Sequence, residues 1–176
     1  MRPTAAEINF VKQQGLMDVS TRTCGYQYPA LMWQPRVIGA LVLLGAVLQA
    51  WLLFLVLSLV LVWSAALPNL NPFDALYNRV VAGPKQRPRL GSAPAPRRFA
   101  QAMAATFMLA ISMSLLSGWS TLAWILEAVL LLALGALIFG RFCLGSYVFL
   151  LCTGRATFAN STLPWARPDS VSEITV

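Results

Sequence analysis

The sequence contains no histidine, the usual axial ligand of haem and the commonest protein ligand of metals such as zinc and copper. We therefore predict no metal site and no bound cofactor. The sequence also shows no nucleophile–base pair and no glycine-rich phosphate loop of the kind that enzymes use. An enzymatic activity is left open but is not favoured.

Charged residues are scarce as well. They make up 11% of the chain, and 58% of its residues are hydrophobic, whereas soluble domains have about 25% charged residues. This composition excludes an ordinary soluble domain. The net charge of +7 comes from 13 basic and 6 acidic residues, and such an excess is typical of the cytoplasmic loops of membrane proteins. No nucleic-acid partner is predicted, because the basic residues lack an aromatic stacking platform.

The chain has three cysteines, Cys24, Cys143 and Cys152, which are too few for a disulfide framework. On one helix, Cys143 and Cys152 would lie on opposite faces and about 13.5 Å apart, too far for a disulfide. A Cys24–Cys143 pair is left as an alternative. The first 36 residues show no signal peptide, so the N-terminus is predicted to be cytoplasmic.

Long apolar stretches dominate what is present. Residues 121–154 carry only Glu127 and Arg141 as charged residues, and residues 37–67 carry none. As one helix, 37–67 would be about 46 Å long, too long for a membrane core of ~30 Å. We therefore expect two helices with a break near Gln49, Ala50 and Trp51.

Basic residues stand on both sides of 37–67. The positive-inside rule places both flanks in the cytoplasm, which requires an even number of crossings between them. A tight transmembrane hairpin is the preferred reading. A re-entrant hairpin is the alternative, because the first arm of this segment is short.

We predict an all-α integral membrane protein with four transmembrane helices as two antiparallel hairpins, joined by a cytoplasmic linker with a short amphipathic interfacial helix. A short helix over 1–15 is expected from the capping box of Thr4 and Glu7, followed by irregular chain over 16–36. The predicted segments are 1–36 (cytoplasmic N-terminal segment), 37–67 (first hairpin), 68–98 (Pro/Arg-rich linker), 99–153 (second hairpin) and 154–176 (loosely ordered cytoplasmic tail).

The linker contains a helix signal over 72–82. Asn71 is a suitable N-cap and Pro72 suits the first turn. The apolar residues that follow have the i, i+3, i+4, i+7, i+8 spacing of an amphipathic helix lying on a membrane surface. They are Phe73, Leu76, Tyr77, Val80 and Val81. The remainder of the linker is predicted to be extended.

The third crossing, 99–117, has a small residue at every fourth position. Such a ridge lets another helix approach closely. Packing within the bundle is the preferred reading, and a dimer or partner face is the alternative. The ridge consists of Ala102, Thr106, Ala110, Ser114 and Gly118.

Glu127 falls inside the fourth crossing, where an ionised carboxylate is costly. It is too far along the helix from Arg141 for a direct pair, about 21 Å. A hydrogen-bonded carboxyl is the preferred reading, and proton or cation handling is the alternative. The expected hydrogen-bonding neighbours are Ser112, Ser114, Ser117 and Trp119.

The segment after this crossing contains Arg141, Cys143 and Ser146. A guanidinium beside the sulfur would favour a thiolate, and Ser146 would share a helical face with Cys143. The pattern is that of a C-x-x-C redox pair with serine in the second place. A serine cannot form the disulfide, which leaves a single thiol able to make mixed disulfides or carry sulfur. A buried, inert cysteine is the preferred alternative.

Four blocks together resemble a bacterial membrane family known as domain of unknown function 4395. They are Gln34-Pro35-Arg36, the run from Asn71 to Asn78, Pro96-Arg97-Arg98-Phe99-Ala100-Gln101, and the run from Gly140 to Tyr147. The resemblance covers about 8–153. The family pattern often reads F-C-x-G-C, and here the last position is Ser146. The resemblance implies a multi-pass inner-membrane protein, sometimes linked with thioredoxin-like or sulfurtransferase partners, and implies no established activity.

Three functions are therefore considered. The first is an accessory or structural subunit of a larger bacterial inner-membrane assembly, with the lipid bilayer and another membrane protein as partners. The second is a membrane-anchored thiol or sulfur relay that uses Cys143. The third is a small transporter. In each case both termini are expected in the cytoplasm.

Overall fold

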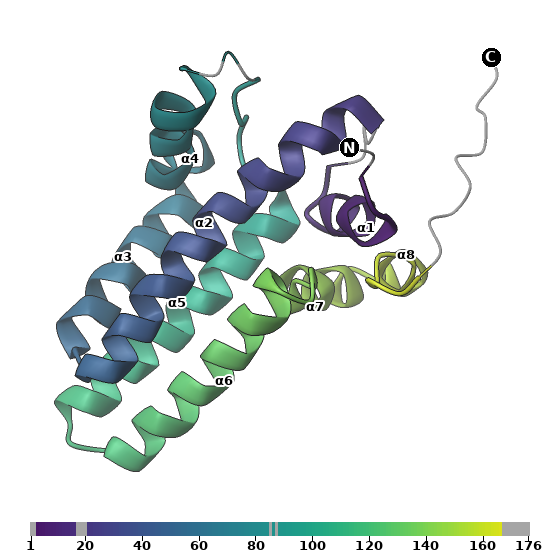
Figure 1. Cartoon of the computed structure of the whole chain (residues 1–176). Helices are drawn as coiled ribbons and strands as arrows, with labels where there is room; N and C mark the ends of the chain where they lie inside the picture. The colour runs from purple at the N-terminus through teal and green to yellow at the C-terminus, as the bar shows by residue number, and fades with distance from the viewer. Residues whose placement is uncertain (1–2, 17–20, 85, 87, 167–176) are drawn as a thin grey trace, which may run out of the picture.

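The computed structural model describes residues 3–16, 21–84, 86 and 88–166, and it leaves the side chains of 21–24 undescribed. Every regular element within these ranges is helical (Figure 1), as the all-α prediction requires. The α-helices are α1 (Ala5–Gln13), α2 (Thr21–Leu48), α3 (Trp51–Ala66), α4 (Pro72–Tyr77), α5 (Ala95–Leu116), α6 (Ser120–Ile138), α7 (Leu144–Cys152) and α8 (Ala156–Ser161). A 3-10 turn, Pro68–Leu70, precedes α4, and a π-helical turn, Asn78–Ala82, follows it.

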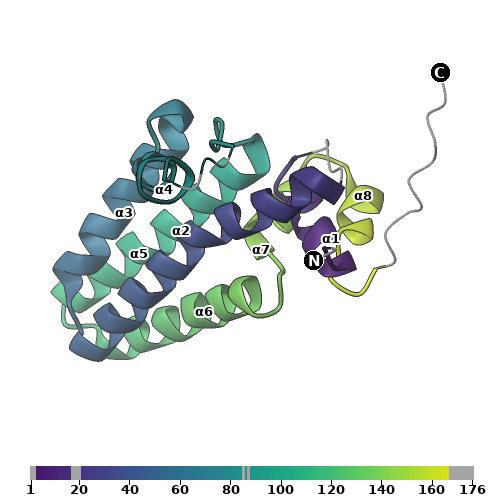
Figure 2. The ribbon, with the colours of Figure 1, turned by 45° about the horizontal axis from the view of Figure 1, so that its top comes forward.

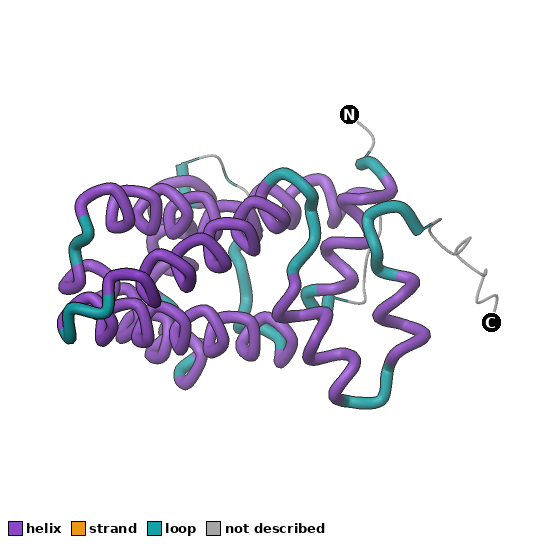
Figure 3. The backbone as a smooth tube through the Cα atoms, turned by 90° about the horizontal axis from the view of Figure 1, so that it is seen from below, coloured by secondary structure: helices purple, strands orange, loops and turns teal. Residues whose placement is uncertain are grey.

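Helices α2, α3, α5 and α6 lie side by side as a bundle, and α1, α7 and α8 form a lobe beside one end of it (Figures 2 and 3). The bundle end next to this side lobe is called the Cys143 end below, and the end with the α2–α3 turn is called the Gln49 end. The main core is apolar and draws on all four bundle helices. It includes Ile38, Val42, Phe54, Leu61, Met108, Ile111 and Leu130.

Three of these helices are long and apolar enough to cross a membrane: Gly25–Leu48 within α2, and the whole of α5 and α6. This indicates a membrane protein. Helix α3 is apolar but has 16 residues, so a fourth crossing stays a prediction.

The predicted irregular chain over 16–36 is wrong from Thr21 onward, because α2 starts there and continues through Pro29 and Pro35. A proline inside a helix removes one hydrogen bond and crowds the preceding turn. Packing outweighs this cost here: Leu31 and Met32 are buried against α1. The first arm of the hairpin is therefore longer than the sequence suggested. The transmembrane hairpin and the re-entrant alternative both stay predictions.

The predicted break near Gln49 is confirmed. Gln49 has a left-handed φ of 48°, and its Nε2 donates to Ala46 O at 2.6 Å. Helix α5 begins at Ala95, four residues before the predicted start at 99. Pro96 is compatible with this earlier start, because its missing N–H costs nothing in a first helical turn.

The predicted helix over 72–82 is present as α4 and the π-helical turn, and Asn71 Oδ1 accepts from Phe73 N at 3.0 Å. Its apolar residues differ in exposure. Tyr77 is buried against Trp33 of α2, whereas Leu76 and Val80 are exposed and Phe73 and Val81 are half-buried. The π-helical turn shifts Val80 and Val81 around the helix axis relative to a regular α-helix. A position of this helix on a membrane surface stays a prediction.

The tail predicted to be loosely ordered is structured up to residue 166. Asn9 of α1 donates from Nδ2 to Leu163 O and Ala166 O, each at 2.9 Å, and these bonds hold the segment after α8 against α1. Residues 167–176 lie outside the described residues.

Candidate functional site

Cys143 lies where the side lobe meets the bundle, as the residue that precedes α7. The chain turns at Arg141, whose φ of 56° is left-handed. Cys143 then adopts an extended conformation, and its backbone N donates to Gln13 Oε1 of α1 at 2.9 Å. Its side chain is buried at 6% exposure among apolar residues of α1 and α2. The thiol is therefore enclosed at the Cys143 end.

Ser146 lies on the same face as Cys143, as the sequence predicted. Its Oγ is 3.3 Å from Cys143 Sγ and also 3.3 Å from Pro96 O. The single hydroxyl proton can serve one of these acceptors at a time. The Ser146 hydroxyl thus links the thiol to the start of α5.

Close packing of α7 against α5 explains why residue 145 is a glycine. A Cβ placed there would lie 2.7 Å from Ala100 Cα. Glycine is therefore needed for the close approach of α7 to α5. The motif has a packing role beside any chemical one.

The guanidinium of Arg141 contacts groups of α1 and α2. Its Nη1 donates to Thr4 Oγ1 at 2.8 Å, its Nη2 lies 3.5 Å from Glu7 Oε1, and its guanidinium lies 5.6 Å from the centre of the Tyr28 ring. These contacts hold the first turn of α1. The predicted capping box of Thr4 and Glu7 is confirmed there.

A buried polar cluster that sequence reasoning missed lies next to this region. Arg97 of α5 makes a two-point ion pair with Asp74 of α4, at 2.6 and 3.1 Å. Gln34 Oε1 of α2 accepts from Arg97 Nη2 at 2.8 Å and from Gln101 Nε2 at 3.0 Å. Arg97 and Asp74 fall in the predicted cytoplasmic linker, 68–98, and both belong to blocks that carry the family resemblance.

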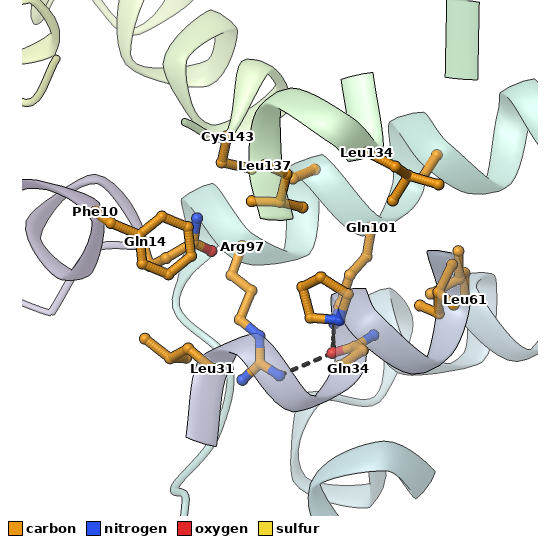
Figure 4. Close-up of a pocket in the computed structure, with 14 residues that line it drawn as sticks. Phe10, Gln14, Leu31, Gln34, Leu61, Arg97, Gln101, Leu134, Leu137 and Cys143 are labelled. Carbon is orange, nitrogen blue, oxygen red and sulfur yellow. Dashed lines mark hydrogen bonds between the residues drawn. The ribbon is translucent and has the colours of Figure 1, made fainter. Parts of the chain in front are cut away.

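Two cavities adjoin Cys143. The first, of about 80 Å³, is bordered by Gln14, Gln34, Arg97 and Gln101 as well as Cys143 (Figure 4). The second, of about 110 Å³, lies among α5, α6 and α7, and its walls are apolar apart from the Cys143 sulfur. The cavities are neighbours, because five residues line both of them. These shared residues are Ala100, Ala104, Leu134, Leu137 and Cys143.

Two residues that line the first cavity each have a buried polar atom without a hydrogen-bond partner. Gln14 Nε2 is an unused donor and Gln101 Oε1 is an unused acceptor. The two residues are 4% and 7% exposed. A buried polar group that lacks a partner destabilises the fold.

Glu127 lies far from this site, at the Gln49 end, and is 1% exposed. Gln49 Nε2 lies 3.1 and 3.3 Å from its two carboxyl oxygens. The expected serine partners are wrong: Ser112 donates to Trp51 O and Ser114 donates to Ala110 O. Ser117 and Trp119 are exposed beyond the end of α5. The preferred reading of a hydrogen-bonded carboxyl agrees with the structure, but the partner comes from the other hairpin.

The small-residue ridge does not pack as a unit within the bundle. Ala102 and Thr106 are exposed, Ala110 is half-buried, Ser114 is buried and Gly118 lies in the turn after α5. Each residue of a helix turns the chain by about 100°, so each fourth residue advances the ridge by about 40° around the axis. Over its length the ridge passes from one side of α5 to the other.

Cys143 and Cys152 are both free thiols, and the possible Cys24–Cys143 pair involves a side chain outside the described residues. Within the described ranges, no three His, Cys, Asp or Glu side chains come together as metal ligands. A single thiol beside two cavities is thus the main chemical feature of the Cys143 end.

A sequence model of the family described as "Domain of unknown function (DUF4395)" matches residues 29–153. The matched segment contains Gln34, Asp74, Arg97, Gln101 and Cys143, whereas α1 and α8 lie outside it. No curated protein and no solved structure gives a match.

Proposed function

This chain belongs to the DUF4395 family, and we propose that it is an accessory, structural subunit of a larger assembly in the bacterial inner membrane. The proposed topology has four crossings with both termini in the cytoplasm. The uncharged α3, which packs along α5, supports the fourth crossing. At 16 residues, α3 is about 24 Å long, shorter than the ~30 Å core, so a crossing would also need the chain that flanks the helix or local thinning of the bilayer.

An exposed stripe along α5 carries the proposal of a membrane-protein partner. Its residues follow alternating steps of three and four, the spacing of a helix–helix seam. Ala102 and Thr106 supply small side chains in the half nearer Cys143, where a partner helix could approach closely. The α5 stripe consists of Phe99, Ala102, Thr106, Leu109, Met113 and Leu116.

The partner is proposed to be a transmembrane helix of a different protein. The test is native mass spectrometry of the particle extracted from its own membrane in a mild detergent. We expect a mass above the 19.2 kDa of the chain, and we expect the double variant Ala102→Leu with Thr106→Leu to lose the added mass, because leucine would hold the partner helix away.

The matched control is Ala128→Leu, which enlarges an exposed small residue of α6 outside the α5 stripe. It is expected to keep the partner. A particle of 19.2 kDa from the unmodified chain would contradict the proposal, and an exact multiple of that mass would replace the partner with a second copy of the chain.

A thiol or sulfur relay is the second candidate, favoured by the position of Cys143 between the two cavities. In the relay step, the Cys143 thiolate attacks the outer sulfur of a donor persulfide R–S–SH. A new S–S bond forms, the donor S–S bond breaks, and the products are Cys143–S–SH and R–S⁻. A thioredoxin-like or sulfurtransferase partner would be the donor.

Sulfur transfer is tested by mixing the purified chain with glutathione persulfide and measuring intact mass. We expect the gain of one sulfur atom on a Cys24→Ser, Cys152→Ser chain and no gain once Cys143→Ser is added. Equal sulfur gain with and without Cys143 would remove this candidate.

A further inference from the structure

Positive charge is left without a counter-charge at the Cys143 end and in the side lobe. Glu7 and Asp74 are each in an ion pair with an arginine, and Glu127 lies buried at the Gln49 end. The other basic side chains that the structure describes form no salt bridge within the described ranges. They are Lys12, Arg36, Arg79, Arg89, Arg98 and Arg155.

Arg98 differs from the other basic residues because its guanidinium is held in place. It lies in the first turn of α5 and reaches across to α3, where its Nε donates to Ala65 O at 2.8 Å. Ala65 is in the last turn of α3, where backbone carbonyls lack an intrahelical donor. The side chain is half-buried, and its two Nη nitrogens make no hydrogen bond with the described part of the chain. The outer donors of this fixed guanidinium are therefore available to a ligand.

The surface at this end of α3 is apolar. Trp63, Leu67 and Leu70 follow one another around the end of the helix and are 53%, 43% and 62% exposed. The indole is fixed there, because Trp63 Nε1 donates to Leu70 O at 3.1 Å. An arginine beside exposed tryptophan and leucine side chains suits the boundary between lipid chains and lipid head groups.

We propose that Arg98 and the end of α3 form a binding site for one anionic phospholipid of the cytoplasmic leaflet. The two Nη nitrogens donate to the lipid phosphate, in the two-point geometry that guanidinium groups adopt with oxyanions. An acyl chain of the same lipid covers Trp63 and Leu67. This inference rests on the proposed crossing by α3, which brings Arg98 to the inner membrane surface.

The charge and the apolar surface together select this occupant. The basic residues without a counter-charge favour a head group with a net negative charge, whereas a zwitterionic lipid brings its own cation. Free phosphate would satisfy the guanidinium but would leave the exposed tryptophan and leucine side chains uncovered. A molecule with both an anionic head and an apolar tail satisfies both parts of the surface.

The test is native mass spectrometry of the full chain in mild detergent, titrated with phosphatidylglycerol or with phosphatidylcholine of the same acyl chains. We expect the first phosphatidylglycerol to bind about tenfold more tightly than the first phosphatidylcholine. Arg98→Gln is expected to remove this difference, because glutamine can still donate to Ala65 O but lacks the two outer donors. Arg155→Gln is the matched control. It removes the same charge from an exposed position in the side lobe and is expected to keep the difference.

A second variant tests the location and leaves Arg98 intact. Leu67→Glu places a carboxylate at the end of α3 and is expected to weaken phosphatidylglycerol binding about fivefold. Leu151→Glu, at an exposed position of α7, is the matched control with unchanged binding.

Three results would overturn the proposal: equal affinity for the two lipids, phosphatidylglycerol binding that neither Arg98→Gln nor Leu67→Glu weakens, or displacement of phosphatidylglycerol by an equal concentration of inorganic phosphate, which would leave a site for phosphate alone. A partner protein at the α5 stripe is detected by its own mass and does not depend on Arg98. Failure of the lipid site is therefore distinguishable from failure of the proposed subunit role.

Discussion

Gln49 performs two tasks at the Gln49 end. Its left-handed backbone turns the chain from α2 into α3, and its side-chain amide donates to Ala46 O and to the buried Glu127 carboxyl. Glu127 thereby gains a partner inside an otherwise apolar helix. The pair links the two helical hairpins at this end of the bundle.

We predict that Gln49→Leu destabilises the protein by about 1–3 kcal/mol, because it leaves the Glu127 carboxyl without its donor. The control is Gln86→Leu, since Gln86 has a similar φ of 46° but is exposed. The difference between the two variants in thermal unfolding isolates the loss of the hydrogen bond from the cost of a left-handed leucine. Equal losses in both variants would show that the Glu127 contact contributes nothing.

Glu127 also bears on the remaining alternative of a small transporter. Its polar contact is made within the chain, with Gln49 Nε2. A transport function stays a prediction. It would be tested by comparing Glu127→Gln with the unmodified chain in an uptake assay.

At the scale of elements, the contact of α7 with α5 positions the Cys143 thiol. Gly145 lies against Ala100, and Phe149 of α7 packs on Phe99 of α5 with ring centres 5.6 Å apart. The thiol depends on this contact because Ser146, in the first turn of α7, reaches both Cys143 and Pro96.

Gly145→Ala is predicted to cost about 1–3 kcal/mol through overpacking, since the new methyl group would meet backbone that cannot move easily. Gly135→Ala on α6 is the matched control, because a Cβ there meets nothing within 4 Å. It is expected to be neutral or to stabilise by up to about 1 kcal/mol through higher helix propensity. Thermal unfolding in detergent compares the two, and a Gly145→Ala protein as stable as the control would contradict the close approach.

For the whole molecule, the proposed four crossings predict where three surface positions lie. Ala5 and Ser92 are exposed on segments that should share the cytoplasmic side, and Ser117 is exposed in the turn after α5 and should face the opposite side. An even number of crossings between Ala5 and Ser92 is possible only if α3 spans the bilayer together with α2.

The measurement uses chains in which the native cysteines are changed to serine and one new cysteine is introduced at a time. A membrane-impermeant thiol reagent applied to intact spheroplasts is expected to label Ser117→Cys but neither Ala5→Cys nor Ser92→Cys until the membrane is permeabilised. Labelling of Ala5→Cys and Ser92→Cys from opposite sides would mean that α3 does not cross.

Local patterns in the sequence predicted several features correctly. The all-α class, the break at Gln49, the capping box at Thr4 and the shared face of Cys143 and Ser146 depend on residues close together in the chain. Neighbouring residues determine the apolar runs, turns and helix caps, so the sequence alone contains enough information for them.

Only the tertiary structure revealed the continuation of α2 through Pro29 and Pro35, the Arg97–Asp74 pair, the Gln49–Glu127 contact and the engagement of Arg141 with α1. Each depends on residues that lie far apart in the chain, and the energy of burying two groups together has no local signature. Packing decided the helical state of the two prolines, and desolvation favoured pairing of the buried charges. The same packing brought Gln14, Gln101 and Cys143 around one cavity.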